Sequence, residues 1–142
     1  MGKDELLIVI RKMAEDHGLD PALVAAVVEQ ESSWIATAKR YEASFESWLR
    51  KRVAGLTDDE YRSRSTSWGL MQVMGQTAVE QGFSGEHSEM HSPLVGIEQG
   101  CIKLKKCLNI AGGDVRKALL CYNGGGNKRY PDEVMARMEK YA

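Results

Sequence analysis

In the stretch PALVAAVVEQESSW, residues 21–34, an apolar helix leads directly into acidic residues. Asp20 suits the N-cap of this helix, and Pro21 suits its first position, where the missing N–H is not needed. Apolar residues recur at helical spacing through the stretch: Leu23, Val24, Val27 and Val28. Glu31 follows them and precedes Trp34. It is either a solvated carboxylate at a helix end or a partly desolvated acid.

The remaining sequence predicts further helices. Apolar residues repeat every three or four positions in five segments, which run from Leu6 to His17, Phe45 to Val53, Leu94 to Leu108, Val115 to Tyr122 and Pro131 to Met138. Thr57 and Glu60 predict a capping box for a short helix. No segment alternates as a strand, and Gly82 to Ser92 is the most loop-like stretch. The predicted fold is all-α, or α with minimal β, in one domain over residues 1–142.

Composition argues against several classes of protein. A net charge of -1 disfavours a nucleic-acid partner, because such proteins usually carry a strong basic excess. The segment Lys103 to Lys106 is interpreted as a solvated helix face, with attraction to an anionic polymer as the alternative. No apolar stretch is long enough for a membrane span. The apolar run Leu6 to Ile10 follows charged residues and precedes no small-residue cleavage site, so no signal peptide is expected.

The three cysteines, Cys101, Cys107 and Cys121, are odd in number and lack CxxC spacing. Cys101 and Cys121 fall on apolar helical positions. They are interpreted as small buried hydrophobic residues rather than a disulfide framework. This interpretation suits a chain folded in a reducing compartment.

Three later strings could line a ligand cleft: SWGLMQV at residues 67–73, CYNGGG at residues 121–126 and YPDEV at residues 130–134. Gly69 would let the backbone approach a ligand, and Gln72 offers a donor and an acceptor to sugar hydroxyls or acetamido groups. Ordinary core packing at a turn is the alternative. Tyr122 ends an apolar helix, so it either packs in the core or places its hydroxyl against Glu31.

EQESSW at residues 29–34 and these three strings follow one another in a particular order and rough spacing. In that order they resemble the signature of the soluble lytic transglycosylases related to goose-type lysozyme, which cut bacterial peptidoglycan. The resemblance runs from about Leu23 to Val134 and implies a lysozyme-like fold. It implies that Glu31 is the catalytic acid and that no metal or cofactor is needed. It also implies that substrate contacts come from Ser67, Met71, Gln72, Tyr122, Asn123 and Tyr130.

The resemblance gives some of these residues particular roles. The Tyr122 hydroxyl would orient Glu31 and influence its pKa, and Asn123 would lie in the cleft. Tyr130 would close one side of the cleft, with a surface aromatic at a helix entry as the alternative. The family often has a further glycine before Ser67; this chain lacks it, so the role of Ser67 follows from a partial match.

The implied reaction is cleavage of the β-1,4 bond between N-acetylmuramic acid (MurNAc) and N-acetylglucosamine (GlcNAc), with Glu31 as the single acid and base and 1,6-anhydro-MurNAc as the product. A hydrolytic lysozyme would need a second carboxylate, for which Glu42 and Glu46 are the candidates. A catalytically inactive wall-binding module is a further alternative. The enzyme would act on the bacterial wall, in the periplasm or on a virion.

Two segments remain outside this pattern. Lys39 to Arg64 is longer than the family needs between its first two strings, and is interpreted as a surface insertion at about residues 39–64. The alternative is that Glu42, near its start, reaches the cleft. His87 and His91 have the spacing of paired zinc ligands, but the order of H-E-x-x-H is absent, so no metal site is expected.

Overall fold

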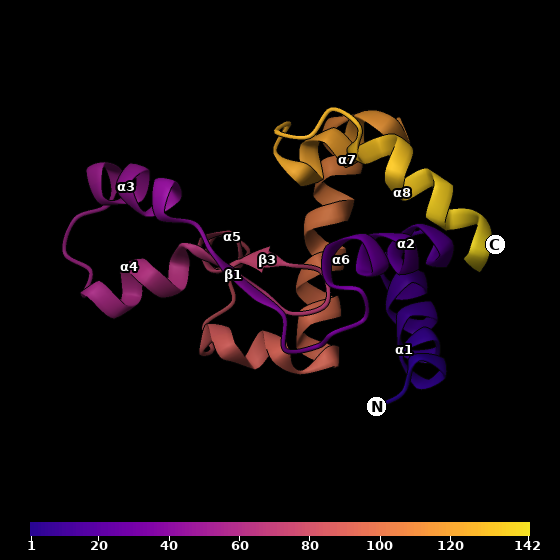
Figure 1. Ribbon diagram of the computed structural model, residues 1–142, viewed down its shortest axis with the longest axis horizontal. Helices are drawn as coiled ribbons and strands as arrows, with labels where there is room; N and C mark the ends of the chain where they lie inside the picture. Colours follow the sequence, from indigo (N-terminus) through magenta and orange to yellow (C-terminus); the bar gives the residue numbers. More distant parts are fainter.

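The computed structural model describes residues 1–142, and most of them lie in helices (Figure 1). Eight α-helices follow in the order α1 (Lys3–Asp16), α2 (Pro21–Ser32), α3 (Ala43–Arg52), α4 (Asp58–Arg64), α5 (Gly75–Glu80), α6 (Pro93–Ile110), α7 (Val115–Asn123) and α8 (Tyr130–Met138). The shorter elements are the 3-10 helices η1 (His87–His91) and η2 (Glu139–Tyr141) and the strands β1 (Lys39–Tyr41), β2 (Thr66–Trp68) and β3 (Val73–Met74). The predicted fold class, α with minimal β, is confirmed.

Helix α2 lies within the hydrophobic core. The Asp20 carboxylate accepts a hydrogen bond from the Ala22 N–H at 2.9 Å, which caps the helix as predicted. Every residue from Ala22 to Val28 is buried, and α1 and α8 pack against this helix. Helix α6 packs against α1, α7 and η1 and completes the core. None of the helices combines the length and the apolar character needed to cross a membrane.

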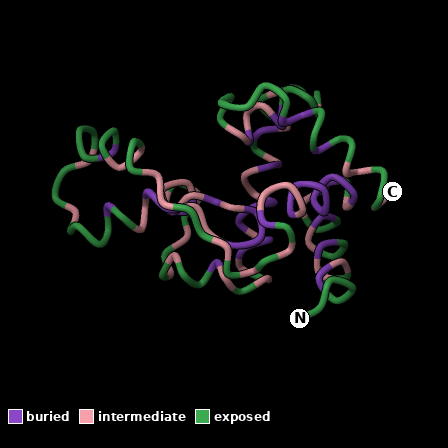
Figure 2. The backbone as a smooth tube through the Cα atoms, in the orientation of Figure 1, coloured by how far each residue is buried: buried purple, intermediate pink, exposed green.

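The three strands form a small antiparallel sheet in the order β1-β2-β3. Within it, Arg40 pairs with Ser67 and Lys39 pairs with Trp68. Helices α3 and α4 extend beyond the sheet, away from α1, α2 and α8, and both chain ends lie on the side of those three helices (Figure 1). Most residues of α3 and α4 are exposed or half-buried, whereas buried residues concentrate around α2 and α6 (Figure 2).

Most predicted helices are confirmed, including the capping box of Thr57 and Glu60. Two details differ. The strands were not predicted, because two or three residues are too few to show alternation. The stretch from Gly82 to Ser92 contains η1, whose first turn is capped by the Glu89 carboxylate at the Glu86 N–H.

The interpretation of the cysteines was wrong for one pair. Cys107 and Cys121 form a disulfide that joins α6 to α7. Their helical positions could not predict this, because sequence periodicity does not tell which faces of two helices meet. Cys101 is a free, buried thiol, as expected. Burial raises its pKa to about 12, so little of it is a reactive thiolate at neutral pH.

Candidate active site

Glu31 lies in the last turn of α2, where the chain changes direction sharply. Ser33 and Trp34 follow with positive φ angles of 49° and 68°, a conformation that costs energy for residues other than glycine. Glu29, two positions earlier, faces another way and accepts a hydrogen bond from Arg137 on α8. Two carboxylates of the same helix therefore differ: Glu29 has a structural ion pair, and Glu31 has none.

Tyr130, the first residue of α8, holds the Glu31 carboxyl. Its buried hydroxyl donates to Glu31 Oε2 at 2.6 Å. Burial raises the pKa of Glu31, and the Tyr130 hydrogen bond and the charges of Lys103 and Arg40 oppose that rise. Because burial is the largest of these effects, Glu31 keeps its proton to higher pH than an exposed glutamate does.

A cleft of about 400 Å³ opens beside Glu31. It is lined by residues of the sheet and of α2, α3, α5, α6 and α7: Glu31, Arg40, Phe45, Ser67, Gln72, Met74, Thr77, Lys103, Cys121, Tyr122, Asn123 and Gly124. Glu31 is the only carboxylate in this lining, and Arg40 and Lys103 are its two cations. The cleft therefore holds one acid in a positively charged surrounding.

Lys103 was interpreted as part of a solvated helix face, which was wrong. Its Nζ donates to the Tyr122 carbonyl at 2.9 Å and lies 4.0 Å from the centre of the Tyr122 ring. Burial lowers the pKa of Lys103, and the nearby Glu31 raises it. In that run, Lys105 is half-buried and Lys106 is exposed. Arg40 and Phe45 were likewise not predicted, because they reach the cleft from the segment interpreted as a surface insertion.

The backbone of the Gly-Leu-Met-Gln turn packs closely against the backbone at Met90. Gly69 has a φ of 78°, and a Cβ there would lie 2.2 Å from the Met90 carbonyl oxygen, so only glycine fits. Gln72 lines the cleft, and its amide nitrogen donates to the carbonyls of Ala38 and Gly69 at 3.0 and 2.9 Å. Both of its N–H groups are used, so Gln72 offers a ligand only its carbonyl oxygen.

The expectation that Met71 contacts substrate needs correction. Its side chain is fully buried and packs against Gly100 of α6, where a Cβ would lie 2.2 Å from the Met71 sulfur. Ser67 and Asn123, in contrast, both line the cleft. The sequence could not separate Met71 from Gln72, because one turn sends neighbouring side chains in opposite directions.

Tyr122 lies beside the cleft, but its hydroxyl does not reach Glu31. It donates to the Met71 carbonyl oxygen at 2.7 Å inside the core. The role expected of Tyr122, a hydroxyl on the acid, therefore falls to Tyr130 in this structure. Both tyrosines lie near a helix end, and only the packing of α8 on α2 decides between them.

Neither acid of the segment 39–64 that was considered for a second carboxylate lines the cleft. Glu42 forms an ion pair with Arg40 at 3.1 Å, and Glu46 accepts from Tyr41 and Arg50. His87 and His91 also make local contacts. His87 Nδ1 lies 2.6 Å from the Ser63 hydroxyl, and the His91 ring packs on Trp68.

This arrangement suits general acid catalysis followed by general base catalysis at one carboxyl. The raised pKa of Glu31 keeps a proton available for donation. After donation, the carboxylate is stabilised by the Tyr130 hydroxyl and by the charges of Lys103 and Arg40. The same group can then accept a proton.

Comparison with known proteins shows the family to which the chain belongs. The Transglycosylase SLT domain family matches residues 8–137. A protein named Transglycosylase from Enterobacteria phage PRD1 is 32% identical over 127 residues, which cover 84% of this chain and 37% of the phage protein. No solved structure matches the chain. The chain belongs to the Transglycosylase SLT domain family.

Proposed function

We propose that this protein is a peptidoglycan lytic transglycosylase that cleaves the β-1,4 bond between MurNAc and GlcNAc. The observation that carries the proposal is the single carboxyl in the cleft, Glu31, with a raised pKa and no second carboxylate beside it. The canonical glycoside hydrolases need a second carboxylate to activate water or to act as nucleophile. A transglycosylase does not, because its nucleophile comes from the substrate.

In this mechanism, Glu31 protonates the bridging oxygen, and the C1–O bond to the leaving sugar breaks. The acetamido group of MurNAc stabilises the positive charge that develops at C1. Glu31, now a carboxylate held by Tyr130, takes the proton of the MurNAc C6 hydroxyl. That oxygen closes on C1, which gives the 1,6-anhydro sugar and returns the proton to Glu31 without consuming water.

The source of the similar protein also suggests where this protein acts. The similar transglycosylase comes from a phage, so we propose a phage-related protein that acts on the bacterial wall, in the periplasm or on a virion. The partner is the glycan strand of peptidoglycan. Arg40 and Lys103 would favour strands that carry carboxylates near the scissile bond.

The test is digestion of purified peptidoglycan by wild type and Glu31→Gln, with mass analysis of the released muropeptides. Wild type should release anhydro-muropeptides, each lighter by one water than a hydrolysed product. Glu31→Gln should lower the rate about 1,000-fold or more, because an amide cannot supply the proton. Its thermal unfolding should stay close to that of wild type, since the change is nearly isosteric.

Three results would contradict the proposal. Reducing-end muropeptides as the wild-type product would favour a lysozyme. Absence of any release by wild type would favour an inactive wall-binding module. Substantial activity in a folded Glu31→Gln variant would move the acid to another residue.

A further inference from the structure

A second pocket lies on the face of the sheet opposite the catalytic cleft. Arg40 and Ser67 pair across β1 and β2, and both line the cleft. Their neighbours Lys39, Tyr41 and Trp68 line the second pocket, which has a volume of about 330 Å³. Because alternate residues of a strand point to opposite faces, the sheet forms a wall between the two sites.

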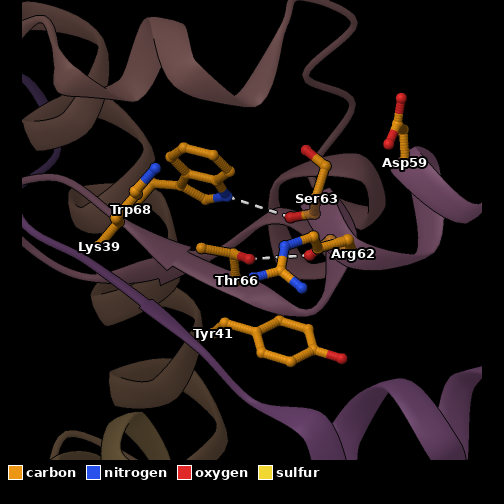
Figure 3. Close-up of a pocket in the computed structure, with 7 residues that line it drawn as sticks. All are labelled: Lys39, Tyr41, Asp59, Arg62, Ser63, Thr66 and Trp68. Atoms are coloured by element: carbon orange, nitrogen blue, oxygen red, sulfur yellow. Dashed lines mark hydrogen bonds between the residues drawn. The ribbon is translucent and has the colours of Figure 1, made fainter.

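Internal hydrogen bonds fix the walls of this pocket (Figure 3). The Trp68 indole N–H donates to the Ser63 carbonyl at 3.1 Å, and the Thr66 hydroxyl donates to the Arg62 carbonyl at 2.8 Å. The Tyr41 hydroxyl donates to a carboxylate of α3 at 3.0 Å. These groups already have partners, so they shape the pocket and hold two aromatic rings in fixed positions.

The cations of the pocket have no anionic partner. The Arg62 guanidinium lies 4.3 Å from the centre of the Tyr41 ring, and Lys39 Nζ lies 5.9 Å from that of Trp68. Neither cation forms a salt bridge, although Asp59 lines the same pocket. In Figure 3 the Asp59 carboxylate points away from the other labelled side chains. The side chains of Lys39 and Arg62 therefore remain available to donate hydrogen bonds to a ligand beside the two rings.

We infer that this pocket is a second, non-catalytic binding site for a carboxylate-bearing muropeptide segment of the glycan. Its volume lies in the range of roughly 300–1,000 Å³ that is typical of small-ligand sites. Aromatic side chains offer apolar surface to a sugar ring, and Lys39 and Arg62 offer charge-assisted hydrogen bonds to the carboxylates of a peptide stem.

The identity of the ligand rests on the proposed function, since peptidoglycan is the polymer that the cleft would cut. A site behind the cleft would keep the enzyme on the wall after each cleavage, because a second contact raises the effective concentration of substrate. A neutral glycan would fit the aromatic surface but would leave both cations without a partner.

The experiment follows backbone amide NMR signals of the full-length Glu31→Gln protein during titration with a disaccharide tetrapeptide muropeptide. Signals of Lys39, Tyr41 and Trp68 should shift, separately from the cleft signals of Asn123 and Gly124. Replacing Lys39 and Arg62 by Gln in this background should weaken binding at the pocket about tenfold or more. A matched pair, Arg11→Gln with Lys106→Gln, removes the same charge at exposed positions outside the pocket and should not change binding.

Several outcomes would overturn the inference. Shifts confined to the cleft, or no shifts at all, would remove the second site. Equal shifts of the pocket signals with a GlcNAc trimer, which has no carboxylate, would remove the role of the cations, as would unchanged affinity in the Lys39 and Arg62 variant. The product masses of the wild-type enzyme test the proposed function independently. Hydrolysed products with shifts at the pocket would end the transglycosylase proposal and leave the second site standing.

Discussion

The contact between Tyr130 and Glu31 makes a prediction about pH. Glu31 must be protonated to act, so activity should fall as pH rises through its pKa. The Tyr130 hydroxyl stabilises the charged form of Glu31 and so opposes the rise of its pKa. In Tyr130→Phe the pKa should rise further, and the alkaline limb of the pH–rate profile should move to higher pH. The maximum rate should fall, because the carboxylate loses its orienting hydrogen bond.

The matched control is Tyr122→Phe, which removes a hydroxyl bonded to the Met71 carbonyl rather than to Glu31. It should lower the free energy of unfolding by about 1–3 kcal/mol, because a buried carbonyl loses its donor. Its pH–rate profile should keep the wild-type shape. Urea unfolding and pH–rate profiles of both variants check this pair. A shifted profile in Tyr122→Phe alone would exchange the roles of the two tyrosines.

The sequence predicted Glu31 as the catalytic acid, and that role stays a prediction. It did not predict which tyrosine donates a hydrogen bond to the Glu31 carboxyl. Local spacing predicts that Tyr122 ends one helix and Tyr130 begins another. The contact to Glu31 spans 99 positions of sequence, so it depends on the packing of α8 on α2. Arg40 and Lys103 could not be predicted for the same reason. They are far apart in the sequence, and the fold brings both of them to the cleft.

At the level of elements, α2 and α8 are joined at both ends of their contact. At the start of α8, Tyr130 donates a hydrogen bond to Glu31. At the end of α8 and in η2, other side chains donate hydrogen bonds to Glu29. Glu29 is 12% exposed and accepts hydrogen bonds from Arg137, Lys140 and Tyr141. The Lys140, Tyr141 and Arg137 hydrogen bonds hold the pKa of Glu29 well below its usual value, against the opposing effect of burial.

Glu29→Gln should therefore lower the free energy of unfolding by about 2 kcal/mol at neutral pH. The pKa of Glu29 is lower in the folded protein than in the unfolded chain, where it is about 4.3. The stability that this difference gives is therefore fully present above the unfolded-state pKa. It is lost as the pH falls from there toward the folded-state pKa. The stability gap between wild type and Glu29→Gln should thus narrow in acid. Glu139→Gln, at an exposed site near the same chain end, is the control and should show no such gap. Urea titrations between pH 3 and pH 7 measure both, and a constant gap would argue against the ion pairs.

The disulfide between Cys107 and Cys121 joins α6 to α7, the helix that carries Tyr122 and Asn123. It closes a short loop, with a sequence separation of 14 residues, so reduction should cost about 3 kcal/mol of stability. Thermal unfolding with and without a reducing agent measures this loss. The double variant Cys107→Ala with Cys121→Ala should unfold like reduced wild type, and Cys101→Ala should still respond to reduction. An unchanged melting temperature on reduction would argue against the bond.

The helices were predictable where caps and apolar periodicity agreed, as in α2, α4 and α6. The strands and the disulfide were not, for a shared reason. Each depends on pairing between segments that are distant or very short, and local pattern carries no information about that pairing. The sheet is small, but it separates the cleft from the second pocket and so organises both sites.

For the whole molecule, the segment 39–64 contains strand β1 and the exposed helices α3 and α4, which extend beyond the sheet. It was interpreted as a surface insertion, and this stays a prediction. Its side chains reach both faces of the sheet: Arg40 and Phe45 enter the cleft, and Lys39 and Arg62 enter the second pocket. Under the proposed function, this segment would bind the glycan rather than cleave it.

Glu42→Gln tests whether the segment 39–64 contributes a catalytic carboxylate. Glu42 pairs with Arg40 at 3.1 Å and does not line the cleft, so it should not activate a water. The variant should release the same anhydro-muropeptides as wild type. Freed from its ion pair, Arg40 should bind substrate carboxylates more strongly, so KM should fall modestly while kcat stays nearly constant.

Arg40→Gln is the counterpart and should raise KM, because the cleft loses one of its two cations. If Glu42→Gln instead stopped product release and wild type made reducing-end products, Glu42 would be the second carboxylate of a lysozyme.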